Sequence, residues 1–209
     1  MSSFNVIRPR DDSAAKESSK WCDDLIAKLK ASTAAHTVSS DIDDGSPADQ
    51  ANISAAMSAG VDLICYFGHG NSSAWLTANS PTIDAGTVGA GKGKAVVSIA
   101  CETGLNLGAD AITSGVESWL GFTIKVPVLL LKGGYDPFGE AIVEGLAELG
   151  EGKSMQEARD ALFAALDQTV DDFDTGFLST DPSAPLGYYA AMSLRDHVVL
   201  HGNGSHVPL

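Results

Sequence analysis

The stretch Val61–Gly70 reads VDLICYFGHG, and a second stretch, Ala95–Gly104, reads AVVSIACETG. Each begins with a run of apolar residues rich in strand formers and ends beside a reactive side chain, His69 in the first and Cys101 in the second. Near-continuous apolar runs of this length are typical of strands buried on both faces of a parallel sheet. The sequence therefore predicts core strands at 61–67 and 94–100, each ending at a reactive residue.

The rest of the chain alternates between strand and helix patterns. Segments rich in turn formers, expected to be surface loops, lie at 41–47, 71–93 and 171–185. Further strands are expected at 4–8, 36–39, 119–124 and 197–200, and helices at 12–30, 48–58, 105–113, 136–149 and 154–166. The last helix opens with a capping box of Ser154 and Glu157. This alternation predicts one α/β domain over 1–209, an open, mainly parallel sheet flanked by helices in three layers (α/β/α).

Composition excludes several classes of function. A formal charge of −14 argues against a nucleic-acid partner, which needs a basic face. The longest apolar run, Val126–Leu131, is far shorter than the roughly 20 residues of a membrane span. The polar start of the chain lacks the features of a signal peptide, so a cytoplasmic location is expected. Three widely spaced cysteines form neither a disulfide framework nor a metal motif, and we expect no metal or other cofactor.

The two core strands bring an imidazole and a thiol together if they are neighbours, since parallel strands lie about 4.8 Å apart. An imidazolium at His69 and the N-terminus of the helix expected from residue 105 would both stabilise a thiolate at Cys101. Gly70 has no side chain to obstruct a substrate carbonyl, so its backbone N–H and that of Cys101 are candidate oxyanion donors. The pattern predicts nucleophilic catalysis by Cys101 with His69 as the base.

The motifs Gly68-His69-Gly70 and Ala100-Cys101, each after an apolar block, resemble those of the caspase-like cysteine peptidases of clan CD. More narrowly, the stretch 96–104 resembles the signature of CHAT domains, and segments at 115–118 and 140–158 are similar as well. The resemblance implies that His69 shuttles protons, that Cys101 forms a thioester and that Gly70 lies in the oxyanion hole. It implies a cysteine endopeptidase acting on a protein or peptide substrate, in a prokaryotic regulatory, defence or cell-death pathway, under the control of an activating protein partner.

The candidate substrate-binding residues predict two opposite substrate preferences. Arg8 and Arg10, at the end of the first strand, would favour an acidic residue before the cleaved bond. Four aspartates on loops near the expected cleft would favour arginine or lysine instead: Asp43, Asp44, Asp84 and Asp136. Charge complementarity in the sequence does not choose between the two.

Two other functions remain open at this point. The same sheet can serve as a catalytically silent, caspase-like binding or regulatory module in which the imidazole and thiol never align. The second alternative is an enzyme of the same fold that acts on a non-protein acyl group. Selective labelling of Cys101 by iodoacetamide near neutral pH would favour an enzyme, because it reports an activated thiolate.

Overall fold

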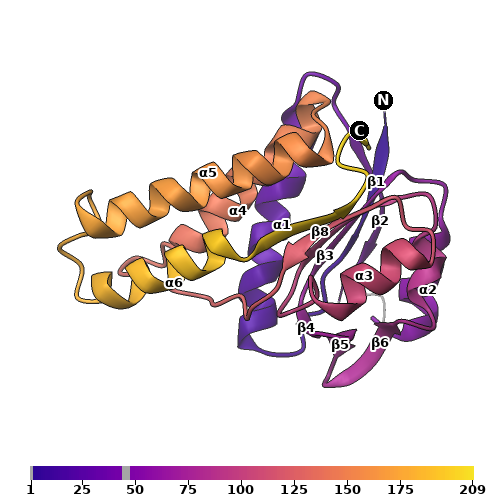
Figure 1. Ribbon diagram of the computed structural model, residues 1–209, viewed down its shortest axis with the longest axis horizontal. Coiled ribbons are helices and arrows are strands. Elements are labelled where there is room, and N and C mark those ends of the chain that lie inside the picture. Colours follow the sequence, from indigo (N-terminus) through magenta and orange to yellow (C-terminus); the bar gives the residue numbers. More distant parts are fainter. Residues whose placement is uncertain (1, 44–47) are drawn as a thin grey trace.

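A computed structural model of the chain describes residues 2–43 and 48–209. Its centre is a six-stranded sheet in the order β2-β1-β3-β7-β8-β9 (Figure 1). Five neighbouring strands are parallel, and the edge strand β9 runs antiparallel to β8. The strands are β1 (Ser3–Ile7), β2 (Thr37–Ile42), β3 (Leu63–Phe67), β7 (Ala95–Ile99), β8 (Ser118–Phe122) and β9 (Val198–Gly202). The predicted mainly parallel sheet flanked by helices is confirmed.

Six helices cover the sheet: α1 (Ser13–Ala31), α2 (Gln50–Ser58), α3 (Asn106–Thr113), α4 (Pro137–Ala147), α5 (Met155–Asp174) and α6 (Ala184–Asp196). The side chains of β3 alternate between two apolar cores. Leu63, Cys65 and Phe67 pack in the core with α1, α4, α5 and α6, and Ile64 and Tyr66 pack in the core with α2 and α3. All five are fully buried, which explains why this strand reads as a continuous apolar run.

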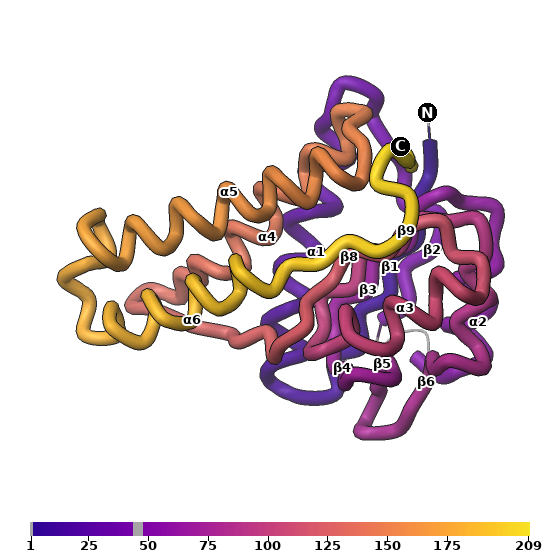
Figure 2. Tube along the Cα trace, in the orientation of Figure 1, coloured from indigo at the N-terminus to yellow at the C-terminus, as the bar shows by residue number. Residues whose placement is uncertain are grey.

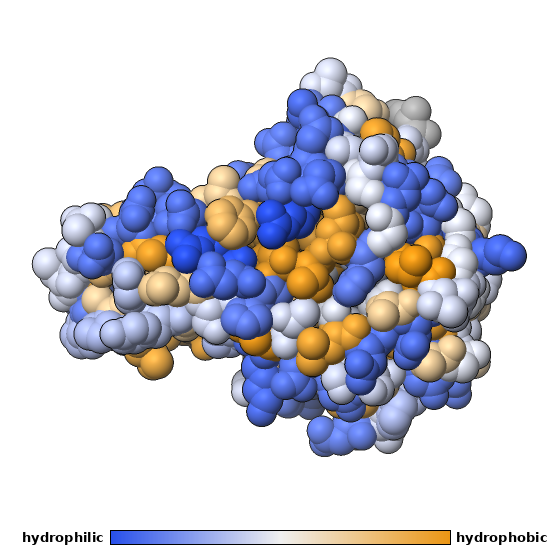
Figure 3. Space-filling model, viewed as in Figure 1, coloured by the Kyte–Doolittle hydropathy of each residue, from blue (hydrophilic) through white to orange (hydrophobic). Residues whose placement is uncertain are grey.

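The helices α4, α5 and α6 lie side by side and extend beyond one end of the sheet (Figures 1 and 2). The capping box of Ser154 and Glu157 opens α5, as the sequence predicts. On the face shown in Figure 3, apolar side chains gather along β9 among hydrophilic ones. Within the described residues, no helix combines the length and the apolar character that crossing a membrane requires.

The prediction of a loop at 71–93 is wrong for most of this segment. It holds most of a small antiparallel sheet of β4 (His69–Asn71), β5 (Ala74–Thr77) and β6 (Ser80–Asp84), followed by a 3-10 turn at Val88–Gly91. Strands of three to five residues are too short to show a period, and their turn residues dominate the sequence pattern. This hairpin sheet begins at His69, directly after β3.

The expected loops at 41–47 and 171–185 are also partly wrong. Strand β2 continues to Ile42, α5 continues to Asp174, and α6 begins at Ala184. Helix α6 was not predicted, although Pro185 stands in its first turn, where proline is well tolerated. Tertiary packing decides these ends, because Ala184, Ala191 and Leu194 complete the core against α5.

Candidate active site

The carboxyl ends of β3 and β7 lie side by side. Phe67 pairs with Ile99 at the last position of the ladder, and the Gly68 N–H donates a hydrogen bond of 3.3 Å to the Ile99 carbonyl. His69 and Cys101 each follow the last residues of this ladder by two positions. The sheet thus sets side by side the two strand ends after which the sequence places its reactive residues.

His69 meets an acidic pair at the start of α1. Its Nε2 lies 2.9 Å from Asp12 Oδ2 and 4.0 Å from Asp11 Oδ1, and its side chain is 30% exposed. The contact with Asp12 is an ion pair when the imidazole is protonated. These three residues also form a group that could hold a metal ion, since their ligand atoms lie within 4.8 Å of one another.

Asp12 is held in place by the helix that it caps. Its side chain accepts a hydrogen bond of 2.9 Å from the Ala15 N–H. That bond, more than the contact with His69, keeps the pKa of Asp12 below its ordinary value, and burial opposes the shift. The sequence analysis missed this residue. Its signal is the position of an N-cap aspartate directly after β1, because the chain leaves β1 at the same sheet edge as His69.

The hydroxyl of Tyr66 holds the backbone of His69 in place. The Tyr66 hydroxyl lies 2.8 Å from the His69 carbonyl oxygen and 2.9 Å from that of Leu76 on β5. The ring is fully buried and stacks on Trp75 with 4.2 Å between centroids. Burial raises the pKa of this phenol, so the hydroxyl stays protonated and keeps its donor.

Cys101 follows β7 and is partly buried. Burial raises the pKa of its thiol above the ordinary value; Glu102 adds to this rise, while the Val126 backbone N–H and Lys125 lower the pKa. The expected stabilisation of a thiolate by His69 and a helix N-terminus is therefore not the dominant effect. Helix α3 begins only at Asn106 and has no side-chain cap.

Gly70 lies directly against the turn that carries Cys101. A Cβ at Gly70 would stand 2.6 Å from Thr103 Cγ2, 3.0 Å from Ala100 Cβ and 3.1 Å from the Cys101 carbonyl oxygen. Any other residue would push β4 away from the turn. Glycine at this position therefore permits the close approach of the two chain segments.

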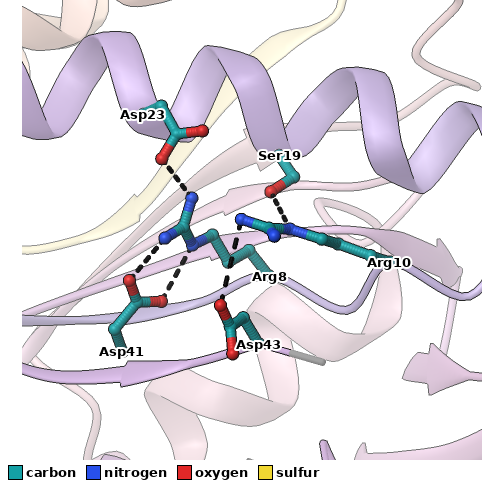
Figure 4. A network of polar contacts seen from close by, with 6 residues as sticks. All are labelled: Arg8, Arg10, Ser19, Asp23, Asp41 and Asp43. Atoms are coloured by element: carbon teal, nitrogen blue, oxygen red, sulfur yellow. Dashed lines mark hydrogen bonds and ion pairs between the residues drawn. The ribbon is translucent and has the colours of Figure 1, made fainter. Parts of the chain in front are cut away.

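Arg8 is engaged in a buried ion-pair network (Figure 4). Its Nε and Nη2 donate to the two oxygens of Asp41 at 2.8 and 2.5 Å, and Nη1 donates to Asp23. Its side chain is only 8% exposed. The hydrogen bonds to Asp41 raise the pKa of Arg8 most, against the effect of burial. These bonds tie Arg8 into the fold, and its expected contact with substrate stays a prediction.

Arg10 and Asp43 face each other at 3.9 Å, and Arg10 Nε donates to Ser19 Oγ at 2.8 Å (Figure 4). The sequence assigned these two residues to opposite substrate preferences, and the structure pairs them. Asp84 accepts hydrogen bonds from the Gly86 N–H and from Thr87 in the turn after β6. Asp44 lies outside the described residues.

Asp136 caps α4 by accepting from the Phe138 and Gly139 N–H groups. Burial raises the pKa of this carboxyl, while these N–H groups and that of Leu129 lower it. Its Oδ1 accepts both capping bonds, whereas its Oδ2 is buried without a hydrogen-bond partner. Of the three expected aspartates that the structure describes, Asp136 lines a large cavity.

That cavity has a volume of about 520 Å³ and lies between α1, α4 and the segment that precedes α4. Two lysines on its wall are paired with glutamates, Lys20 with Glu17 at 2.6 Å and Lys28 with Glu144 at 2.7 Å. Carboxylates dominate the remaining charge. The lining residues are Glu17, Lys20, Trp21, Asp24, Ala27, Lys28, Leu130, Gly134, Tyr135, Asp136, Gly139, Glu140, Val143 and Glu144.

Residues 10–122, more than half of the chain and including His69 and Cys101, match the family model of Peptidase family C25. The chain belongs to Peptidase family C25. The caspase-like, clan CD resemblance is therefore confirmed, whereas the narrower resemblance to CHAT domains finds no support in this match. No curated protein sequence matches the chain significantly.

Two solved structures share this C25 chain's fold. The Arg-specific cysteine proteinase gingipain R matches with a TM-score of 0.62 at 14% identity, over 99% of this chain and 47% of that one. The complex of the pro- and mature domains of RgpB from Porphyromonas gingivalis matches with a TM-score of 0.59 at 12% identity, over 99% and 48%. The chain thus spans about half the length of these structures.

Proposed function

We propose that this C25 chain is a cysteine endopeptidase that cleaves a protein or peptide through His69 and Cys101. The register between β3 and β7 supports the proposal, because it sets side by side two described strand ends that each lead from an apolar run to a reactive residue. Family membership supports the same reaction class.

In the proposed reaction, Cys101 Sγ attacks the scissile carbonyl carbon and its proton passes to His69. The tetrahedral intermediate collapses to a thioester, and the leaving amine takes the proton from the imidazolium. Water, deprotonated by His69, then hydrolyses the thioester and regenerates the thiol. Because Asp12 faces Nε2, the other ring nitrogen, Nδ1, is the one assigned to these proton transfers.

Gly70 suits the role of an oxyanion donor for a reason of strand geometry. Asn71 and Ala74 close the two-residue turn between β4 and β5, and residues that close such a turn exchange hydrogen bonds. Pairs alternate along an antiparallel ladder, so Gly70 and Trp75 form the pair without hydrogen bonds. The Gly70 N–H then points away from β5 and is left for a developing oxyanion, together with that of Cys101.

The raised pKa of Cys101 sets the order of events. In the free protein the thiol is protonated at neutral pH, because burial outweighs the Val126 N–H and Lys125. Attack therefore begins from a thiol, with His69 as general base, and not from a preformed ion pair. Slow alkylation of Cys101 at neutral pH in the absence of substrate is compatible with this mechanism.

We also propose a preference for substrates with basic residues. The segment from Val126, which contacts Cys101, to Asp136 leads from the thiol to the acidic cavity between α1 and α4. A cavity lined both by apolar residues such as Trp21 and Val143 and by several carboxylates suits the aliphatic stem and charged head of lysine or arginine. The likeness to an Arg-specific proteinase points the same way.

The biological setting stays a prediction. An activating partner and a regulatory, defence or cell-death pathway are what the family resemblance implies, and a cytoplasmic location is expected from the polar start of the chain. The C25 match does not bear on any of them.

The test is mass spectrometry of a proteome-derived peptide library after incubation with wild type, Cys101→Ala and His69→Gln, with and without cell lysate. We expect cuts beside basic residues that vanish in both variants. His197→Gln is the matched control, since this histidine is exposed at the end of α6. If no cut depends on Cys101 under either condition, the chain is a catalytically silent binding module and the proposal fails.

A further inference from the structure

A chain of buried hydrogen bonds lies beneath the turn that carries Cys101. Trp75 Nε1 donates to Ser98 Oγ at 2.8 Å, Ser98 Oγ lies 2.8 Å from Thr103 Oγ1, and the Thr103 hydroxyl donates to the Ala100 carbonyl at 3.3 Å. Since Thr103 gives its proton to Ala100, Ser98 must donate to Thr103. The bonds therefore all run in one direction, from an indole on β5 to the carbonyl that precedes Cys101.

The side chains in this chain of bonds have no contact with solvent. Trp75, Ser98 and Thr103 are all 0% exposed. A buried hydroxyl that loses its partner costs about 1–3 kcal/mol, so each member favours one arrangement of the others. This arrangement includes the orientation of the Ala100 peptide and thus of the Cys101 N–H that follows it.

Thr103 also contacts the other half of the site. A Cβ added at Gly70 would lie only 2.6 Å from Thr103 Cγ2, so this methyl group packs against the Gly70 backbone. One side chain therefore touches both segments that carry oxyanion donors: its hydroxyl holds the residue before Cys101, and its methyl abuts Gly70.

The turn is also tied to the end of β8 and to the segment that follows this strand. The Glu102 N–H donates to Ile124 and the Gly104 N–H to Phe122, at 2.9 and 2.8 Å. Glu102 adopts φ of +60°, a conformation that non-glycine residues rarely adopt and that the surrounding contacts must enforce. With these bonds in place, Thr103 sets the relation of the turn to β4.

We propose that Thr103 is a positioning residue that aligns the Gly70 and Cys101 N–H groups as one oxyanion hole. This inference rests on the proposed peptidase function and assigns that site a residue that acts through the backbone, without touching substrate. Misplacement of a donor by about 1 Å costs on the order of 100-fold in rate, so small shifts at Thr103 have a large effect.

Two variants separate the two halves of the side chain. Thr103→Val keeps a methyl against Gly70 and removes the hydroxyl, whereas Thr103→Ser keeps the hydroxyl and removes the methyl. For each we expect kcat on a cleaved peptide to fall about 10- to 100-fold with KM changed less than about twofold, because the defect lies in the transition state. Thr103→Ala should lose at least as much as the more impaired of the two.

Thr169 provides a matched control. It is also buried, and its hydroxyl donates to the Ala165 carbonyl at 3.0 Å on α5. Thr169→Val and Thr169→Ser make the same chemical changes away from the site, so they should alter thermal stability without altering kcat. Labelling of the buried Cys22 and Cys65 reports whether any variant has loosened the core.

Backbone ¹⁵N NMR tests the alignment without relying on activity. We expect the Gly70 amide resonance to shift in Thr103→Ser and the Cys101 amide to shift in Thr103→Val, with both unchanged in the Thr169 variants. Unshifted resonances, or a kcat equal to wild type in both Thr103 variants, would overturn the inference. If wild type shows no cleavage that depends on Cys101, the proposed function fails, and the NMR comparison alone decides whether Thr103 couples the two segments.

Discussion

Two charged clusters lie near the carboxyl end of β1, one around Arg8 and one around Asp11 and Asp12. They differ in how fully their polar atoms are paired. In the first, Arg8 is buried and binds Asp41 and Asp23 through three of its nitrogens. In the second, His69 is partly exposed beside Asp11 and Asp12, and its Nε2 lacks an aligned hydrogen bond. We expect the first cluster, centred on a buried guanidinium, to stabilise the fold, and the second to serve the proposed proton transfers.

Removal of one carboxylate from the Arg8 cluster should have the largest effect, and it should fall on stability. In Asp41→Asn the buried guanidinium loses its bidentate partner, and we expect the free energy of unfolding to drop by about 2 kcal/mol. The figure is below that of a fully buried pair because Asp41 is about one-third exposed. Urea denaturation followed by circular dichroism measures it.

Asp23→Asn is the internal control, because this carboxylate is more exposed and makes one bond to Arg8. It should cost less than Asp41→Asn. Equal losses in the two variants, or no loss in either, would show that the cluster does not stabilise the fold in the way described.

The second cluster should respond in catalysis and not in stability. Asp12→Asn keeps an N-cap side chain for α1 but removes the negative charge facing His69, so we expect kcat to fall by about 10-fold with little change in the free energy of unfolding. Asp49→Asn is the matched control, since Asp49 caps α2 by the same kind of bond, to Asn52, away from the site. A similar loss of activity in both variants would contradict a role for Asp12 at His69.

The smallest expected effect is a difference in acid stability. The pKa of Asp12 is lowered in the folded protein, so its contribution is complete above the unfolded value of about 3.8 and is lost as the pH falls through the folded pKa. Below pH 4, wild type should therefore lose stability faster than Asp12→Asn. Because Asp12 is more than half exposed, the difference should stay under about 1 kcal/mol. If wild type and Asp12→Asn lost stability equally as the pH falls, the predicted direction of the difference would be wrong.

Much of the fold follows from local pattern in the sequence. The buried strands β3 and β7, the capping box of Ser154 and the amphipathic α1 were all predicted within a few residues of their observed ends. The short strands β4 to β6 were not, because three to five residues between turn formers carry no readable period. Helix α6 was missed because its proline-bearing start lies in a stretch dense in turn formers.

The candidate site, too, could be predicted from the sequence only in part. Sequence singled out His69, Gly70 and Cys101 because each follows an apolar strand, and the register of β3 with β7 brings their segments together. It proposed Arg8 as a substrate contact because charge in a sequence says nothing of burial, and the structure shows that charge neutralised by two aspartates. Thr103 gave no such signal, because it acts through the backbone, and the N-cap position of Asp12 after β1 does not reveal its distant partner, His69.

The sequence by itself determined where strands end and which reactive residues stand at those ends, because hydrophobic periodicity and residue chemistry are local properties. Only the tertiary structure decided which charges are paired and which hydroxyl joins the two halves of the site. Those outcomes depend on contacts across the sheet, such as Asp12 with His69 and Thr103 with Gly70, that no local pattern encodes.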